Sequence, residues 1–423
     1  MKAILEQATI QLPSAWRLLL WVLLGAGVLM FITGLAMGDV DRSTERTWEA
    51  FLINLLFWGG LAQAGVILAA IWQITDAKWG RPFKRLAEGF ASFLPLALAG
   101  FIAVFFGAEY LYEWVHEPME VKAGYLNLGF FVTRNLIGLC VLFGLSLWFV
   151  QTSLKPDFGL AQKLIPSWGG SFFARRLLKG YGDHESEVVR LELRSRKLAP
   201  ALAIAQSFIF TMVIFDYLMS LDQEWFSTLF GVFVMVGNLY SAAALLLIIA
   251  TVVRRLPGVA EYLTINRYHD LTKLTFAFAA LWTYMAFSQY LVIWYSNLPE
   301  ETPYLVTRSI ADTPWKPLFW VLFGVLFVFP FLVLMPKTIC RKPNLVAVIA
   351  GILLVGQWWA NYLMVVPSIQ DRHENPQFLF GAHEVLITAG FGGAFFLCFF
   401  WFMSRVPILP ISDKHLTKTW HGH

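Results

Sequence analysis

Ten runs of about twenty apolar residues, each closed by a polar or charged stretch, occupy most of this chain of 423 residues. A helix of about twenty residues is long enough to cross the hydrocarbon core of a bilayer. Only 14% of the residues are charged, whereas about a quarter are charged in an average soluble domain. The sequence therefore predicts an all-α polytopic membrane protein, with residues 1–423 forming a single integral membrane domain. The predicted spans are Trp16–Met37, Phe51–Ile74, Phe90–Leu111, Leu126–Val150, Leu198–Leu221, Phe226–Val253, Leu271–Ser296, Pro317–Met335, Leu345–Val366 and His383–Ser404.

Lysine and arginine are divided unequally between the two sets of loops. An even number of spans places both termini on one side, and most of the 32 Lys and Arg residues lie on that side. Because short cytoplasmic loops carry the positive excess, we predict cytoplasmic N- and C-termini in a bacterial inner membrane. The net charge of +4 then reflects topology and gives no support to a nucleic-acid partner. The outer loops contain Arg42, Arg46, Lys122, Arg308, Lys316 and Arg372.

Cysteine and histidine do not occur in ligand patterns. Cys140, Cys340 and Cys398 lie in or beside apolar runs and have no C-x-x-C spacing, which is typical of small buried apolar residues. A haem within the membrane would need axial ligands inside helices, and the eight histidines lie in loops, in the tail or at helix ends. We therefore expect no haem, iron–sulfur cluster or metal bound by this chain itself.

Two segments are predicted on the cytoplasmic side, a loop over residues 151–197 and a C-terminal tail over residues 405–423. Within the loop, Phe172–Lys179 and Val188–Lys197 mix apolar residues with Arg and Lys. Such segments usually lie on the lipid interface, so we predict an interfacial loop, with a dedicated docking surface as the alternative.

Polar side chains inside the spans indicate where function resides, because an ionisable group in hydrocarbon costs several kcal/mol unless it is paired or hydrated. Glu109, Arg134 and Asp216 are predicted at similar depth in the outer half of three sequential helices. We interpret them as part of a proton path or polar cavity that opens to the outer side, with a structural ion-pair network as the alternative. The inner half is predicted to be poorer in polar residues. Further candidates, each of which could also be an interhelical hydrogen bond, are Asn238, Tyr284, Gln289, Gln357, Asn361, His383 and Glu384.

Two outer connections contain distinctive motifs. The stretch Phe215–Gly231 includes Asp222, Trp225 and Ser227, and the stretch Phe287–Thr302 includes Asn297, Pro299, Glu300 and Glu301. Together with Tyr112–His116 and Asn361–Pro367, these stretches resemble the F subunit of bacterial alternative complex III. In that family Trp is common where Tyr217 stands, and Pro-His where Gln223 and Glu224 stand, so this chain has no histidine at that position of the outer connection.

The resemblance implies an NrfD-like pair of four-helix bundles, helices two to five and six to nine, with peripheral helices. It also implies a membrane subunit of a respiratory quinol oxidoreductase with no redox centre of its own, serving assembly and proton or conformational coupling. The implied partners are a multihaem cytochrome with haem c, an iron–sulfur subunit, a second NrfD-like subunit, small membrane subunits and a terminal oxidase, with quinol in the complex and lipid around it. An independent secondary transporter and a purely structural membrane anchor remain as alternatives.

Overall fold

The computed structural model of the chain describes residues 10–38, 40–165, 172–370, 377–413 and 416. Regular structure in these residues is helical throughout. Ten of the described helical runs are long and apolar enough to cross a membrane, and each overlaps one predicted span. The chain is therefore an all-α, multi-pass membrane protein, as the sequence predicts.

Seven of the ten spans are single unbroken α-helices, and three are composites of several helical segments. The spans are α2 (Ser14–Ala36), α3 (Ser43–Ile74), Lys78–Leu111, α7 (Leu128–Leu164), His184–Leu221, α11 (Phe230–Val253), α12 (Ile265–Ser296), Lys316–Leu334, α17 (Pro343–Gln370) and α18 (Ala382–Met403). Span three comprises η2 (Lys78–Phe83), α4 (Lys84–Gly89), η3 (Phe90–Phe93), α5 (Leu94–Val104), η4 (Phe105–Gly107) and α6 (Ala108–Leu111). Span five comprises α9 (His184–Ala205), the π-helical η7 (Gln206–Phe210), α10 (Thr211–Tyr217) and η8 (Met219–Leu221), and span eight comprises α14 (Lys316–Phe323), the π-helical η9 (Gly324–Val328) and α15 (Phe329–Leu334). Short helices in the connections are η1 (Val40–Arg42), η5 (Glu113–Val115), α8 (Phe172–Leu177), α13 (Thr302–Ser309) and α16 (Lys337–Cys340).

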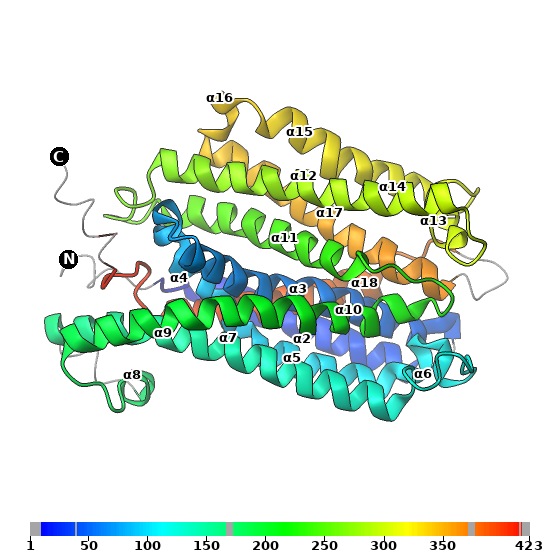
Figure 1. Cartoon of the computed structure of the whole chain (residues 1–423), viewed down its shortest axis with the longest axis horizontal. Coiled ribbons are helices and arrows are strands. Elements are labelled where there is room, and N and C mark those ends of the chain that lie inside the picture. The colour runs from blue at the N-terminus through cyan, green and yellow to red at the C-terminus, as the bar shows by residue number, and fades with distance from the viewer. Residues whose placement is uncertain (1–9, 39, 166–171, 371–376, 414–415, 417–423) are drawn as a thin grey trace.

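The spans run side by side along the long axis of the molecule (Figure 1). We call the end where α2 begins and α18 ends the terminal end, and the opposite end the far end. Helices α3, α5, α7 and α9–α10 pack together as bundle one, and α11, α12, α14–α15 and α17 pack together as bundle two. Helices α3 and α11 join the bundles at the centre. This is the predicted arrangement of two four-helix bundles.

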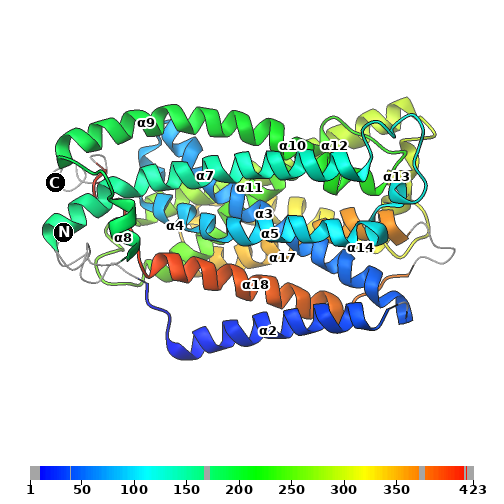
Figure 2. The same ribbon diagram turned by 90° about the horizontal axis from the view of Figure 1, so that it is seen from below.

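Helices α2 and α18 form a peripheral pair beside bundle one, along α3 (Figure 2). Gly27 of α2 and Gly390 of α18 meet face to face, and a Cβ added to Gly27 would lie 2.5 Å from the Gly390 Cα. Such close backbone approach is how membrane helices associate through dispersion contacts when water supplies no driving force. The two glycines therefore set the spacing of this pair.

The connection predicted over residues 151–197 is much shorter than expected. Helix α7 continues past the predicted end at Val150 to Leu164, and α9 begins at His184, where the Asp183 side chain caps it. Hydropathy falls at Lys155 and Asp157, but a helix needs only its backbone hydrogen bonds to continue. Residues 166–171 of the connection, with 414–415 and 417–423 of the predicted tail, lie outside the described part of the chain.

Candidate functional site

Arg134 of α7 and Asp216 of α10 form a buried ion pair near the far end of bundle one. The guanidinium donates through Nε to Oδ2 at 2.7 Å and through Nη2 to Oδ1 at 2.6 Å. The Asn135 amide adds a third hydrogen bond to Asp216, at 2.6 Å. Two parallel charge-assisted bonds are the strongest arrangement for this pair of side chains.

The connection before α7 encloses the guanidinium from the other side. Arg134 Nη1 donates to the Tyr125 carbonyl at 2.6 Å, and the guanidinium carbon lies 3.7 Å from the centre of the Tyr125 ring. Burial, together with the negative charge of Asp216, raises the pKa of the Tyr125 phenol to about 12. The phenol therefore stays protonated at neutral pH, and its ring contributes a cation–π contact.

Glu109 does not join this pair. Span three ends in short helical turns, and Glu109 on α6 is exposed. Its backbone carbonyl, not its carboxylate, is the group that lies 3.0 Å from His116 Nε2. The three predicted charges therefore do not form one group. Two of them, Arg134 and Asp216, form an ion pair with the Asn135 amide, and this arrangement is close to the predicted alternative of a structural ion-pair network.

A buried hydrogen-bond trio occupies the middle of bundle one. The Ser146 hydroxyl of α7 donates to Gln63 Oε1 of α3 at 3.0 Å, and Gln63 Nε2 donates to Gln206 Oε1 at 3.0 Å. Gln206 is the first residue of the π-helical segment. Such segments, in which one extra residue is fitted into a helical turn, occur frequently at functional sites.

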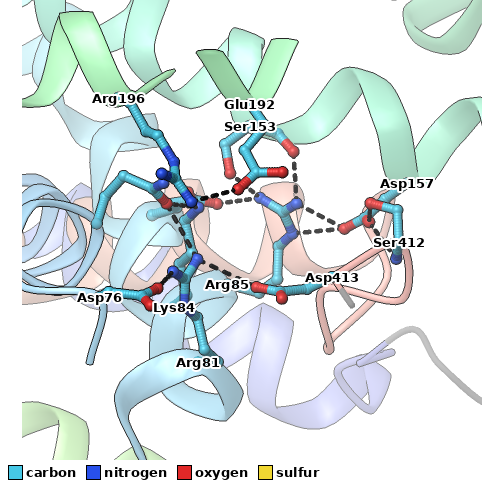
Figure 3. A network of polar contacts seen from close by, with 12 residues as sticks. Asp76, Arg81, Lys84, Arg85, Ser153, Asp157, Glu192, Arg196, Ser412 and Asp413 are labelled. Carbon is cyan, nitrogen blue, oxygen red and sulfur yellow. Dashed lines mark hydrogen bonds and ion pairs between the residues drawn. The ribbon is translucent and has the colours of Figure 1, made fainter. Parts of the chain in front are cut away.

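The terminal end of bundle one contains a larger buried cluster (Figure 3). Arg85 donates to Asp157 Oδ2 through Nε at 2.9 Å and through Nη2 at 2.5 Å, and also pairs with Glu88. Lys84 Nζ lies 3.9 Å from Glu88 Oε1, and each of these four side chains is at most 8% exposed. Two cations and two carboxylates in one dehydrated cluster form a balanced network, which we call the terminal cluster.

A non-helical segment after α18, residues 404–413, covers the terminal cluster. We call this segment the strap. The Ser412 backbone N–H donates to Asp157 Oδ1 at 2.9 Å, and the Ser412 hydroxyl donates to the same oxygen. Arg81 Nη1 donates to Asp413 Oδ2 at 3.1 Å. The apolar strap residues are at most 4% exposed; they are Val406, Ile408, Leu409 and Ile411.

One face of α7 connects these three sets of polar groups. Asn135, Ser146 and Asp157 follow one another at intervals of eleven residues, about three helical turns, so they point the same way. Together with their partners they form a line along bundle one, which we call the polar line. Neighbouring groups of the line are about 16 Å apart along the helix, too far for direct proton transfer between them. The polar line thus places charged side chains at both ends of bundle one and uncharged polar side chains in its middle.

The remaining predicted residues lie elsewhere. Asn238, Gln357 and Asn361 are buried where α3, α11 and α17 meet, and Asn238 lies against Gly60. Tyr284 is 65% exposed on the outside of bundle two and does not line the interior.

Two predicted residues at the start of α18 lie at the far end against α3. His383 Nε2 is 3.0 Å from the Ser43 hydroxyl, and Glu384 pairs with Arg46 at 3.0 Å. They form a second polar group, separate from the Arg134–Asp216 pair.

The two sequence motifs meet at the far end. The Ser227 hydroxyl donates to Gln289 Oε1 at 3.1 Å, and Asp222 Oδ1 accepts the Trp225 backbone N–H at 3.1 Å. The Trp225 ring stacks on Tyr304 with ring centres 3.8 Å apart. In the second motif, Asn297 ends α12 in a left-handed conformation, Pro299 and Glu300 are exposed, and Glu301 is buried. These contacts give the motifs a clear structural role in joining the bundles at one end.

The sequence interpretation missed the terminal cluster. Arg85 lies among several basic residues between two predicted spans and so resembles an ordinary loop charge, and Glu88 and Asp157 lie just outside the predicted spans. The sequence does contain one signal for this cluster. Glu88 and Asp157 are acidic residues that lie beside apolar runs, on the side of the protein that is rich in basic residues. The terminal end of bundle one thus contains buried polar groups that the predicted spans do not include.

Neither a scan against protein-family models nor a search of curated proteins finds a match to this chain.

Proposed function

We propose that this chain is an integral membrane subunit of a respiratory quinol oxidoreductase of the alternative complex III type. In this proposal it carries no redox centre and serves assembly and proton or conformational coupling. The motif resemblance supplies the class of complex. The observation that carries the coupling role is the polar line, because its charged groups lie at both ends of a bundle whose middle also contains buried amides.

The proposed orientation follows the basic residues. The terminal end faces the cytoplasm of a bacterial inner membrane, so the terminal cluster lies on the cytoplasmic side and the Arg134–Asp216 pair on the outer side. Electrons pass through the haem c and iron–sulfur partner subunits, and quinol is oxidised in the complex. This chain contributes polar groups that respond to a partner's movement.

Copurification tests the class of complex. Native membranes are solubilised in mild detergent, the chain is captured, and the associated proteins are identified together with their haem absorbance. The proposal expects a stable set of haem and iron–sulfur subunits with a second membrane subunit of similar size. A lone chain would contradict the proposal and favour an independent transporter.

Replacing Asp216 with Asn tests the coupling role, since it keeps the shape of the side chain and removes its charge. The proposal expects the variant complex to oxidise quinol in detergent, where no gradient opposes turnover, and to translocate fewer protons in liposomes. Asp270→Asn is a matched control, because Asp270 pairs with Lys273 on an exposed surface at 3.1 Å. Unchanged proton stoichiometry in the assembled Asp216→Asn complex would leave only an assembly role for the pair.

A further inference from the structure

Glu49 is a second buried carboxyl group at the far end, in the second turn of α3. Its residue is 3% exposed. Among the described residues, a single hydrogen bond reaches the carboxyl group, from the Gln370 amide at 3.1 Å. No lysine, arginine or histidine of the described chain lies within 4.0 Å of it. Glu49 thus differs from Glu88, Asp157, Asp216 and Glu384, which are buried carboxylates with a cationic partner among the described residues.

The cations near Glu49 are engaged elsewhere. Arg46, three residues earlier on α3, binds Glu384 of α18 through Nη2 at 3.0 and 3.1 Å. Arg42 of η1 donates to Gln370 Oε1 at 2.8 Å. Two further carboxyl groups face the site, Glu384 from α18 and Glu45 one turn earlier on α3. The side chain of α17 that faces it, Gln370, is neutral.

The neutral groups nearby add no compensating charge. His383 of α18 contacts the Ser43 hydroxyl at 3.0 Å, and Tyr362 of α17 donates to the Leu379 carbonyl at 2.8 Å. A buried carboxylate with one amide donor and neighbouring negative charges is strongly destabilised, because burial and like charges both disfavour the ionised form.

Asp216 provides the contrast at the same end of the molecule. It receives two guanidinium hydrogen bonds from Arg134 and one amide hydrogen bond from Asn135. Asp216 therefore has a cationic partner, whereas Glu49 has none within 4.0 Å among the described residues. Two buried carboxyl groups at one end of the molecule thus have opposite electrostatic surroundings.

We propose that Glu49 is a neutral carboxylic acid, and that its carboxyl group is a proton-binding site at the far end of the molecule. Loss of the proton breaks the O–H bond, passes H⁺ to water at that end and leaves a carboxylate. Arg46 lies three residues away on the same helix face, so it is placed to turn from Glu384 to Glu49 when that charge forms. Release of the proton would then loosen the contact between α3 and α18. The inference concerns one side chain and does not depend on which complex contains the protein.

Infrared spectroscopy of the purified full-length chain in lipid tests the proposal. A protonated carboxylic acid gives a carbonyl stretch that a carboxylate lacks, and the band moves when H₂O is replaced by D₂O. We expect such a band at neutral pH, its loss in Glu49→Gln, and its retention in Asp216→Asn, which leaves the Glu49 carboxyl group in place. A band that is unaltered by Glu49→Gln, or that is lost in Asp216→Asn, overturns the assignment.

A second variant keeps the test decisive if Glu49→Gln fails to fold. Glu49→Asp retains a carboxyl group one methylene further from Gln370, so its acid band should persist at a shifted frequency. An acid band at the wild-type frequency in Glu49→Asp would show that the signal arises from another residue and would refute the proposal.

Discussion

Asp157 binds two parts of the chain that are far apart in sequence, one with each carboxylate oxygen. Oδ2 accepts from Arg85 at 2.5 Å, and Oδ1 accepts from the Ser412 backbone N–H at 2.9 Å. The same carboxylate therefore neutralises the terminal cluster and holds the strap that covers it.

Removing the Ser412 hydroxyl should make the strap dissociate from the terminal cluster more often. Ser412→Ala deletes one hydrogen bond to a carboxylate, and we expect cleavage by trypsin after the exposed Arg405 to become faster on the order of ten-fold. Ser404→Ala makes the same chemical change in the strap without touching the terminal cluster, because the Ser404 hydroxyl bonds the Trp401 carbonyl. Equal cleavage rates in the two variants would show that the hydroxyl does not fasten the strap.

The Arg134–Asp216 pair should show strong coupling in a double-mutant cycle. Asp216→Asn leaves a buried guanidinium without its carboxylate, at an expected cost of about 3–5 kcal/mol in the free energy of unfolding. Adding Arg134→Gln removes the unpaired charge, so the double variant should recover part of that loss. The measurement is unfolding in detergent by denaturant titration. Additive losses in the double variant would argue against a direct ion pair.

The contact between α2 and α18 should depend on Gly27. Gly27→Val forces side-chain atoms into the Gly390 backbone, and we expect a loss of about 1–3 kcal/mol in stability. Gly25→Val is the control, because nothing lies within 4 Å of a Cβ at Gly25. The melting temperatures of both variants are measured by thermal unfolding in the same detergent. Identical melting temperatures would contradict a role for this glycine in packing.

The start of α9 should become less ordered in acid. The backbone N–H of Ser186 donates to the Asp183 carboxylate at 3.3 Å and lowers the pKa of that group, with a further contribution from Glu185. A lowered pKa in the folded state gives stability that is present above the ordinary aspartate pKa and is lost as the pH falls through the folded value. The protection factors of the amides of residues 184–190, which are exchange rates corrected for the intrinsic pH dependence, should therefore fall at low pH. Asp183→Asn should abolish that pH dependence while it keeps a cap, and an unchanged pH profile would refute this explanation.

The sequence predicted the ten spans because hydropathy reports directly which segments can lie in lipid, whereas the two bundles were expected from the motif resemblance. It also identified Arg134 and Asp216 as exceptional, because a charge inside an apolar run is visible without coordinates. The contacts show that the two side chains pair with one another. Glu109 was grouped with them by depth alone, and depth does not report which way a side chain points.

The terminal cluster could not be predicted in the same way. Arg85, Glu88 and Asp157 lie where hydropathy is already low, so their composition resembles an exposed loop. Their burial depends on the strap and on the continuation of α7 beyond Val150, and both are tertiary features. Glu49 was missed for a related reason, since its position near a helix start resembles that of a solvated residue at the membrane surface.

The order of elements along the chain gives the strap a role in biogenesis. Ser412 follows Asp157 by 255 residues and comes after all ten spans, so the ribosome must make every membrane helix before Asp157 obtains this partner. Until then, Asp157 lacks the two hydrogen bonds that Ser412 donates to it. Docking of the strap would then mark the completion of membrane integration, and a chain interrupted before Ser412 would display an uncovered charged cluster that quality-control proteases can recognise.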